Sequence, residues 1–138
     1  MPIEVHLVTP EREVWSGDAE MVIARGIEGE VGILGGHAPL LIRLAIGPLR
    51  IHGTGGERDV AVVDGGFLHV STEEGATRVD VLANSGELAG EIDLAAARHR
   101  KDQAEAKLQN RDTQVAEAEV VAAEAELEKA IARITIAG

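Results

Sequence analysis

The stretch GEVGILGGHAPLL at residues 29–41 is the first place where the chain suggests chemistry, because glycines stand beside a histidine. A phosphate-binding loop needs such glycines, a lysine and a following helix. No lysine stands at the required place, and Pro39 occupies the position where that helix would begin. We therefore interpret the stretch as turn residues between strands. We expect four aliphatic side chains in it to be available to the core: Ile33, Leu34, Leu40 and Leu41.

The histidines are the next candidates, because imidazole is a common metal ligand. They are His6, His37, His52, His69 and His99. None pairs with another at the short spacings that zinc sites favour. Isolated surface or sheet-face histidines are therefore the favoured interpretation. A cluster formed in space by His6, His52 and His69 stays open as the alternative.

Nucleophilic and acid–base chemistry finds little support. No serine lies in a GxSxG sequence. The carboxylate pairs Glu28/Glu30 and Glu73/Glu74 sit in polar stretches, where solvated charge is the default. The sequence therefore predicts no catalytic residues and no metal site.

Composition narrows the function classes further. The 138 residues carry a formal net charge of −11, which disfavours binding to nucleic acid or to an anionic membrane surface. There is no cysteine, and Trp15 and Phe67 are the only aromatic residues, so the core must be aliphatic. The start MPIEVHLVTP does not resemble a secretory signal, and no apolar run is long enough to insert into a membrane.

Glycine, proline and alanine divide the chain into two parts. Every glycine except Gly138 and every proline lies within residues 1–90, whereas alanine crowds into the region after residue 94. We place the boundary in the segment Ser85–Glu91, which gives a domain of residues 1–86 and a second domain of residues 87–138.

The first part has the pattern of short strands. Glu4–Thr9 alternates polar and apolar residues, and Ala19–Arg25 is rich in β-branched residues. Two hairpins are expected, around Gly53–Gly56 and around Thr72–Ala76. Turn signals recur without a helical period between them, which favours an antiparallel β-sandwich or barrel.

The second part has the pattern of two helices. Asp93 is a candidate N-cap for a helix that runs to about Gln109, and the polar break Asn110–Asp112 separates it from a helix of about Thr113–Ile134. The short break predicts an αα-hairpin whose facing seams are rich in alanine. Alanine buries little area, so the hairpin is either a plain capping element or a movable one.

Charge also differs between the two helices. The first carries several bases, among them Arg98, Arg100 and Lys107, and the second is mainly acidic, with Glu117, Glu119, Glu124, Glu126 and Glu128. Opposite charges on neighbouring helices can steer pairing, although exposed pairs stabilise little.

These motifs together resemble the epsilon subunit of F-type ATP synthases, in its bacterial form. The family pattern is close to GxxGILPGHAPLL, followed later by GGFL, and this chain keeps Gly29, Gly32, Ile33, Leu34 and the run Gly36–Leu41. Gly65–Leu68 and the ending ARITIA also match, so the resemblance covers nearly the whole chain. Gly35 replaces the usual proline, for which we expect a looser turn.

The resemblance implies a β-sandwich followed by an αα-hairpin in the central stalk of the rotary motor. It implies a non-catalytic subunit whose sandwich binds the gamma subunit and the c-ring. Its helices would reach the alpha and beta subunits and regulate ATP hydrolysis. The matching interface positions are Glu28, Gly29, Glu30, Val31 and His37, which the resemblance places at one end of the sandwich. The alternative is that Glu28 and Glu30 form only a solvated turn.

Some bacterial members of this family bind ATP on the hairpin through a pattern close to I/L-D-x-x-R-A. Here Ile92 and Asp93 match, but Ala96 stands at the arginine position. Near the end of the second helix, Lys129 and Arg133 occupy the two basic positions. Alanine offers no cation to a phosphate and lysine is only a point charge, so we expect weak or absent ATP binding and no other cofactor. The acidic second helix also predicts moderate or weak inhibition of hydrolysis.

Two further interpretations stay open from the sequence. The chain is a free-standing β-sandwich binding module with a docking hairpin, or, as a distant third, an enzyme. The resemblance and the lack of a transit peptide favour a peripheral protein on the cytoplasmic face of a bacterial plasma membrane, held there through its protein partners.

Overall fold

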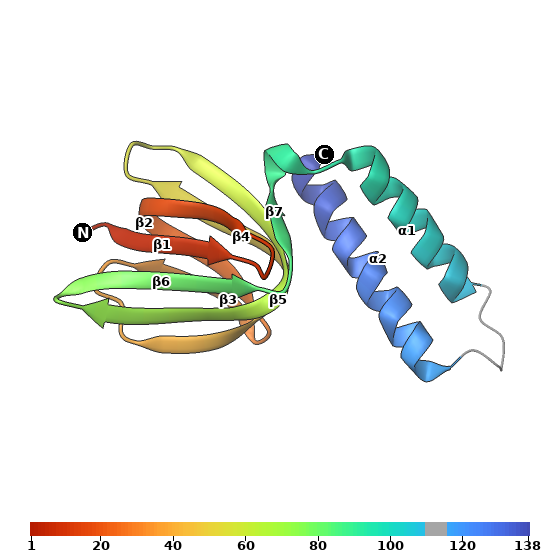
Figure 1. Ribbon diagram of the computed structural model, residues 1–138, viewed down its shortest axis with the longest axis horizontal. Helices are drawn as coiled ribbons and strands as arrows, with labels where there is room; N and C mark the ends of the chain where they lie inside the picture. Colours follow the sequence, from red (N-terminus) through yellow and green to blue (C-terminus); the bar gives the residue numbers. More distant parts are fainter. Residues whose placement is uncertain (110–115) are drawn as a thin grey trace. The chain divides into compact units, whose positions relative to one another are not determined.

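The computed structural model describes residues 1–109 and 116–138, which form two units, Met1–Ala89 and Gly90–Gly138 (Figure 1). The first unit is built from strands and the second from two helices. This is the predicted fold class, a β-sandwich followed by a helical hairpin. The predicted break Asn110–Asp112 and the predicted helix start at Thr113 lie outside the described residues.

Seven strands make up the first unit. They are β1 (Ile3–Val8), β2 (Glu13–Gly26), β3 (Gly29–Leu34), β4 (Leu40–Gly53), β5 (Arg58–Glu73), β6 (Ala76–Ala83) and β7 (Gly86–Leu88). Hydrogen bonds join β1, β6, β5, β4 and β2 in that order, and β2 pairs again with β1, which closes the ring. The strand β3 pairs with β2, and β7 pairs with β5.

Long, bent strands serve both layers of the sandwich. The first half of β2 pairs with β1, and its second half pairs with β3 on one side and β4 on the other. The register of β2 against β4 shifts between Ala19 and Met21. Such bulges turn a strand so that it passes from one sheet layer to the next.

One pairing differs from the predicted all-antiparallel arrangement. β1 and β6 run parallel, with Ile3 opposite Thr77 and Val8 opposite Leu82 (Figure 1). A tight hairpin forces two strands to be antiparallel, but β1 and β6 lie far apart in sequence and carry no such constraint. Sequence alternation does not specify the direction of that pair.

The core of the first unit is aliphatic, as the composition predicted. Its strands alternate buried and exposed residues, and fully buried side chains include Ile3, Leu7, Ile33, Leu49 and Leu68. In residues 29–41, Ile33 is fully buried and Leu40 packs against the core. The prediction for Leu34 and Leu41 was wrong, because they are 54% and 64% exposed. Neighbouring residues of a strand point to opposite faces, so each of the two faces outward.

The turn after β3 explains the glycine at position 35. Gly36 has the positive φ, 84°, and its N–H donates to Thr77 Oγ1 at 2.8 Å. At Gly35, a Cβ atom would collide with the backbone carbonyl oxygen of Met1. Gly35 is therefore needed for a close approach of two chain segments, and the turn is tied to β6 through Thr77.

The second unit contains α1 (Leu94–Gln109) and α2 (Glu117–Ala137), preceded by a short 3₁₀ helix at Ala89–Glu91. Asp93 caps α1 as predicted, because its Oδ1 accepts a hydrogen bond from the N–H of Ala96 at 3.0 Å. As described, α2 begins at Glu117, since Ala116 has extended backbone angles, and it ends three residues beyond the predicted end at Ile134. The residues that the two helices bury include four alanines: Ala97, Ala104, Ala123 and Ala130.

Candidate functional site

The predicted interface residues begin in the turn between β2 and β3. Gly26 pairs with Gly29 to close this turn, and the N–H of Ile27 donates to the carbonyl of Arg43 on β4 at 3.1 Å. Gly29 has a φ of 133°, a region open mainly to glycine. The side chains of Glu28 and Glu30 are exposed, so the turn presents carboxylates to solvent next to β4.

His37 lies away from this turn. The strand β3 runs from Gly29 to Leu34, and His37 follows its far end, where its N–H donates to the carbonyl of Leu34 at 3.1 Å. Five steps of about 3.4 Å separate Gly29 from Leu34 at the two ends of β3 by roughly 17 Å. Glu30 and His37 therefore lie at opposite ends of β3, and any partner touching both must span the strand.

An exposed apolar strip runs across the outer face of β4, β5 and β6. It consists of Leu41, Phe67 and Leu82, which are 64%, 46% and 55% exposed. Phe67 pairs with Arg43 on one side and Leu82 on the other, so these side chains share one face of the sheet. Because Ile27 hydrogen-bonds to Arg43, the acidic turn lies beside this apolar strip.

Sequence reasoning missed the apolar strip. Leu41 lies in an almost continuous apolar run, LLIRLAI, which hides the phase of the strand. The exposure of Phe67 and Leu82 could in principle have been predicted. Each lies next to buried residues of its own strand, and successive residues of a strand point to opposite faces. Only the register between the strands shows that they lie together.

Polar side chains border the apolar strip on the same face. A row of cross-strand pairs runs from Leu41 on β4 to His69 on β5, then to Asp80 on β6 and to His6 on β1. Arg78 donates from Nε to Asp80 Oδ2 at 3.0 Å and from Nη1 to Glu4 Oε2 at 3.3 Å. The hydrogen bond and charge of Asp80, with Glu4 adding to them, raise the pKa of the Arg78 guanidinium. This border is therefore a fixed network of charges beside an apolar surface.

The histidines do not form a metal centre. Within residues 1–109 and 116–138, no group of three or more histidine, aspartate or glutamate side chains could hold a metal ion. His6 lies 3.3 Å from Glu13 and 3.5 Å from Glu4, and His37 contacts the carbonyl of Ala38 at 2.7 Å. These contacts are those of surface histidines on a sheet and in a turn.

The positions matching the nucleotide pattern are engaged within the hairpin. Ile92 and Asp93 precede α1, and Asp93 is occupied as its N-cap. Lys129 Nζ lies 3.4 Å from Glu126 Oε1, and Arg133 Nη1 donates to the carbonyl of Lys129 at 3.2 Å. The cations therefore already have partners on α2.

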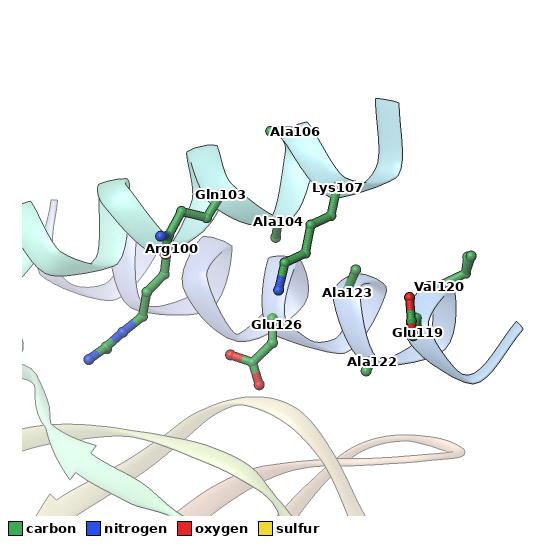
Figure 2. A pocket seen from close by; sticks show the side chains of 10 residues that line it. All are labelled: Arg100, Gln103, Ala104, Ala106, Lys107, Glu119, Val120, Ala122, Ala123 and Glu126. Carbon is green, nitrogen blue, oxygen red and sulfur yellow. The ribbon is translucent and has the colours of Figure 1, made fainter. Parts of the chain in front are cut away.

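A cavity of about 740 Å³ lies elsewhere in the hairpin, between α1 and α2 (Figure 2). None of Ile92, Asp93, Lys129 and Arg133 lines it. Arg100 and Lys107 extend from α1, and Glu126 from α2, on the same side of the helix pair in Figure 2. The cavity is therefore lined by basic side chains of α1, acidic side chains of α2 and alanines. This mixture of charges does not favour an anionic ligand.

None of the described helices has the length and apolar character needed to cross a bilayer.

The family comparisons cover both units. The family model described as "ATP synthase, Delta/Epsilon chain, beta-sandwich domain" matches residues 2–89. The family model described as "ATP synthase, Delta/Epsilon chain, long alpha-helix domain" matches residues 91–138. An ATP synthase epsilon chain from an Exiguobacterium species is 38% identical over 134 residues, which is 97% of this chain and 94% of the relative. One from Chromohalobacter salexigens is 39% identical, over 93% and 86% of the two chains.

Solved structures agree on the fold. A chain in the mitochondrial ATP synthase of Euglena gracilis, described as OSCP/F1/c-ring in rotational state 1, matches with a TM-score of 0.79 and 29% identity, over 94% of this chain and 78% of that one. A chain from the central stalk and c-ring of the Tetrahymena thermophila enzyme matches in fold with a TM-score of 0.59 at 19% identity. The chain that carries this acidic turn, apolar strip and alanine-rich hairpin belongs to the ATP synthase epsilon-chain family, in its bacterial form.

Proposed function

We propose that this ATP synthase epsilon chain is a non-catalytic part of the central stalk that links the gamma subunit to the c-ring, so that proton-driven rotation is passed on for ATP synthesis. The observation that carries the proposal is the apolar strip of Leu41, Phe67 and Leu82, exposed on a sheet face beside an acidic turn. Exposed apolar patches mark interaction surfaces, and phenylalanine is among the residues enriched in the cores of protein–protein interfaces.

The gamma subunit is the partner we assign to the apolar strip. Phe67 lies centrally in it, and Arg43 and His69 stand at its border. Covering these side chains would bury apolar area at about 25 cal/mol per Å². The fixed network around Arg78 and Asp80 would give that contact its orientation, because charged borders supply specificity more than affinity.

The c-ring is the partner we assign to the turn Glu28–Val31. Its exposed carboxylates suit polar loops of a ring that rotates with the stalk. His37, at the other end of β3, would form a separate contact with gamma or with the ring. Both contacts hold the chain at the cytoplasmic face of the membrane as a peripheral subunit, through protein partners and without insertion.

The helices are assigned a regulatory role through the alpha and beta subunits. Their buried residues include small alanines, and α2 presents five glutamates, so a strong inhibitory contact with an acidic segment is not expected. ATP binding through Ile92, Asp93, Lys129 and Arg133 is expected to be weak or absent, because Ala96 supplies no cation and the remaining cations are paired within α2. Calorimetry on the full chain that gave a clear micromolar affinity would contradict this.

The test of the main proposal is assembly with purified gamma subunit. The double substitution Phe67→Ser and Leu82→Ser should weaken co-elution of the chain with gamma at least tenfold, because it removes the anchor without touching the core. The matched control is Val121→Ser with Ile131→Ser, which alters two exposed apolar residues of α2. Fluorescence of Trp15 verifies folding. Unchanged co-elution of the strip variant would reject the proposal, and a wild-type chain that never co-elutes would favour a free-standing binding module.

A further inference from the structure

The second outer face of the sandwich has the opposite character to the apolar strip. It is formed by the second half of β2 with the neighbouring parts of β4 and β5. Met21 pairs with His52 and Ile23 with Arg50, and on the other side His52 pairs with Arg58, Arg50 with Val60 and Pro48 with Val62. Together with Arg25, two residues beyond Ile23 on β2, these positions share one sheet face, on which Val62 is fully buried and the other eight are half-buried or exposed. Three of the nine are arginines, and two acids border them, because Glu30 on β3 lies opposite Arg25 and Glu87 on β7 lies opposite Val62.

The three arginines follow a diagonal across the strands. Arg25 is on β2, Arg50 on β4 and Arg58 on β5, each displaced by two residues from the position directly opposite its neighbour. Such diagonal neighbours lie about 7–8 Å apart. All three are exposed. We call Arg25, Arg50 and Arg58 the arginine diagonal.

Two members of the arginine diagonal have no ion-pair or hydrogen-bond partner among residues 1–109 and 116–138. Within the described residues, the side chains of Arg25 and Arg50 make no ion pair or hydrogen bond, whereas Arg58 donates to the carbonyl of Glu57 at 3.1 Å. This is unexpected in a chain with 24 acidic and 13 basic residues. Gly47 also makes room for Arg25, because a Cβ there would lie 3.1 Å from its Nη1.

Half-exposed apolar residues flank the arginine diagonal. Met21 and Ile23 lie on one side of it and Val60 on the other, and Leu34 on β3, which is 54% exposed, extends the first group. Arginine and methionine beside aliphatic side chains are the composition of a protein–protein interface. Planar guanidinium groups without a partner bind carboxylates through two parallel hydrogen bonds.

We infer that the arginine diagonal docks a segment of another protein subunit that carries carboxylates about 7 Å apart with apolar side chains between them. A protein segment is favoured over a nucleic acid or an anionic lipid surface, because the half-exposed Met21, Ile23 and Val60 beside the arginines match the mixed apolar and charged composition of protein–protein interfaces. This surface is additional to the apolar strip proposed for gamma and lies on the other outer face of the sandwich.

The test is photo-crosslinking in the assembled ATP synthase with the full chain. A photoreactive phenylalanine derivative replaces Ile23 or Val60, in separate variants, and a third variant carries it at Leu41 to report on the apolar strip. We expect the Ile23 and Val60 variants to crosslink to a segment of another subunit that is rich in Asp or Glu. Arg50→Gln should lower that yield at least fivefold, and Arg98→Gln, which removes an exposed arginine of α1, should not.

Several results would overturn the inference. These are products only within the same chain, products with lipid or with a segment that has no acidic residues, a yield that Arg50→Gln leaves unchanged, or no product from Ile23 and Val60 while Leu41 still crosslinks. Loss of the Leu41 product with retention of the other two would instead count against the proposed gamma contact. The two proposals can therefore fail separately.

Discussion

The sandwich and the helical hairpin are stabilised by different kinds of buried surface. The largest fully buried side chains are isoleucine, leucine and valine, and all lie in the first unit. The hairpin buries mainly alanines, and a cavity of about 740 Å³ opens between its helices. A buried leucine contributes about 1.5–3 kcal/mol and a methyl group less than about 1 kcal/mol. The hairpin is therefore the part expected to open locally at a lower free energy.

The largest effect should come from the core of the sandwich. Leu68→Ala removes a fully buried side chain and should lower the free energy of unfolding by about 2–5 kcal/mol. Urea titration followed by Trp15 fluorescence measures this. The control Leu82→Ala, at a position 55% exposed on the paired strand β6, should change it by less than about 0.5 kcal/mol. Equal effects would mean that the sandwich core is as loosely packed as its surface.

A second change tests a polar contact within the sandwich. Asp64 is buried, its carboxylate accepts a hydrogen bond from Ser85 Oγ, and its backbone N–H donates to the carbonyl of Ser85 at 2.9 Å. Asp64→Ala should cost about 1–3 kcal/mol, because the Ser85 hydroxyl loses its acceptor. Asp64→Asn keeps an acceptor and should cost less in the same titration. The reverse order would show that the negative charge, and not the hydrogen bond, is what matters.

A larger side chain in the hairpin should stabilise it, whereas the substitutions in the sandwich lower the free energy of unfolding. Ala104 is buried in the seam and lines the cavity. Ala104→Leu extends into that space and should stabilise the helix pair by about 0.5–2 kcal/mol. Amide hydrogen exchange of α2 measures the gain as slower exchange. Faster exchange would mean that position 104 is already tightly packed, and the contrast between the two units would weaken.

The smallest effect is expected for an exposed ion pair. Lys101 Nζ lies 3.5 Å from Glu105 Oε1, one turn along α1, and both side chains are about 40% exposed. Lys101→Ala should change helix stability by less than about 0.5 kcal/mol at low salt, and not measurably at 1 M salt. Helical circular dichroism on heating checks this. A loss above 1 kcal/mol would show that charge, more than buried area, stabilises the hairpin.

Local patterns predicted much of the fold but little of the candidate site. The cap at Asp93, the turn around Gly53–Gly56 and the alternation in β1 depend on neighbours in sequence, and each was readable. The arginine diagonal was not, because Arg25, Arg50 and Arg58 come together only through the register of three strands. Registers between distant segments are set by packing of the whole sheet, which no single window of sequence contains.

The separation of His37 from the acidic turn has the same origin. The glycines around β3 predict turns, but they do not predict that the segment between the turns is an extended strand of six residues. The parallel pairing of β1 with β6 likewise depends on the closing of the ring, and not on either strand alone.

The contact between Gly35 and Met1 has a consequence for how this family varies. A Cβ at position 35 cannot coexist with the present path of the backbone at residue 1. A relative with proline at the matching position would therefore need a different backbone path before its first strand. The path of that leading segment should differ between relatives with and without glycine at this position, although more than thirty residues separate the two. A chimera that carries proline at position 35 should recover stability when it also receives the leading segment of a proline-containing relative.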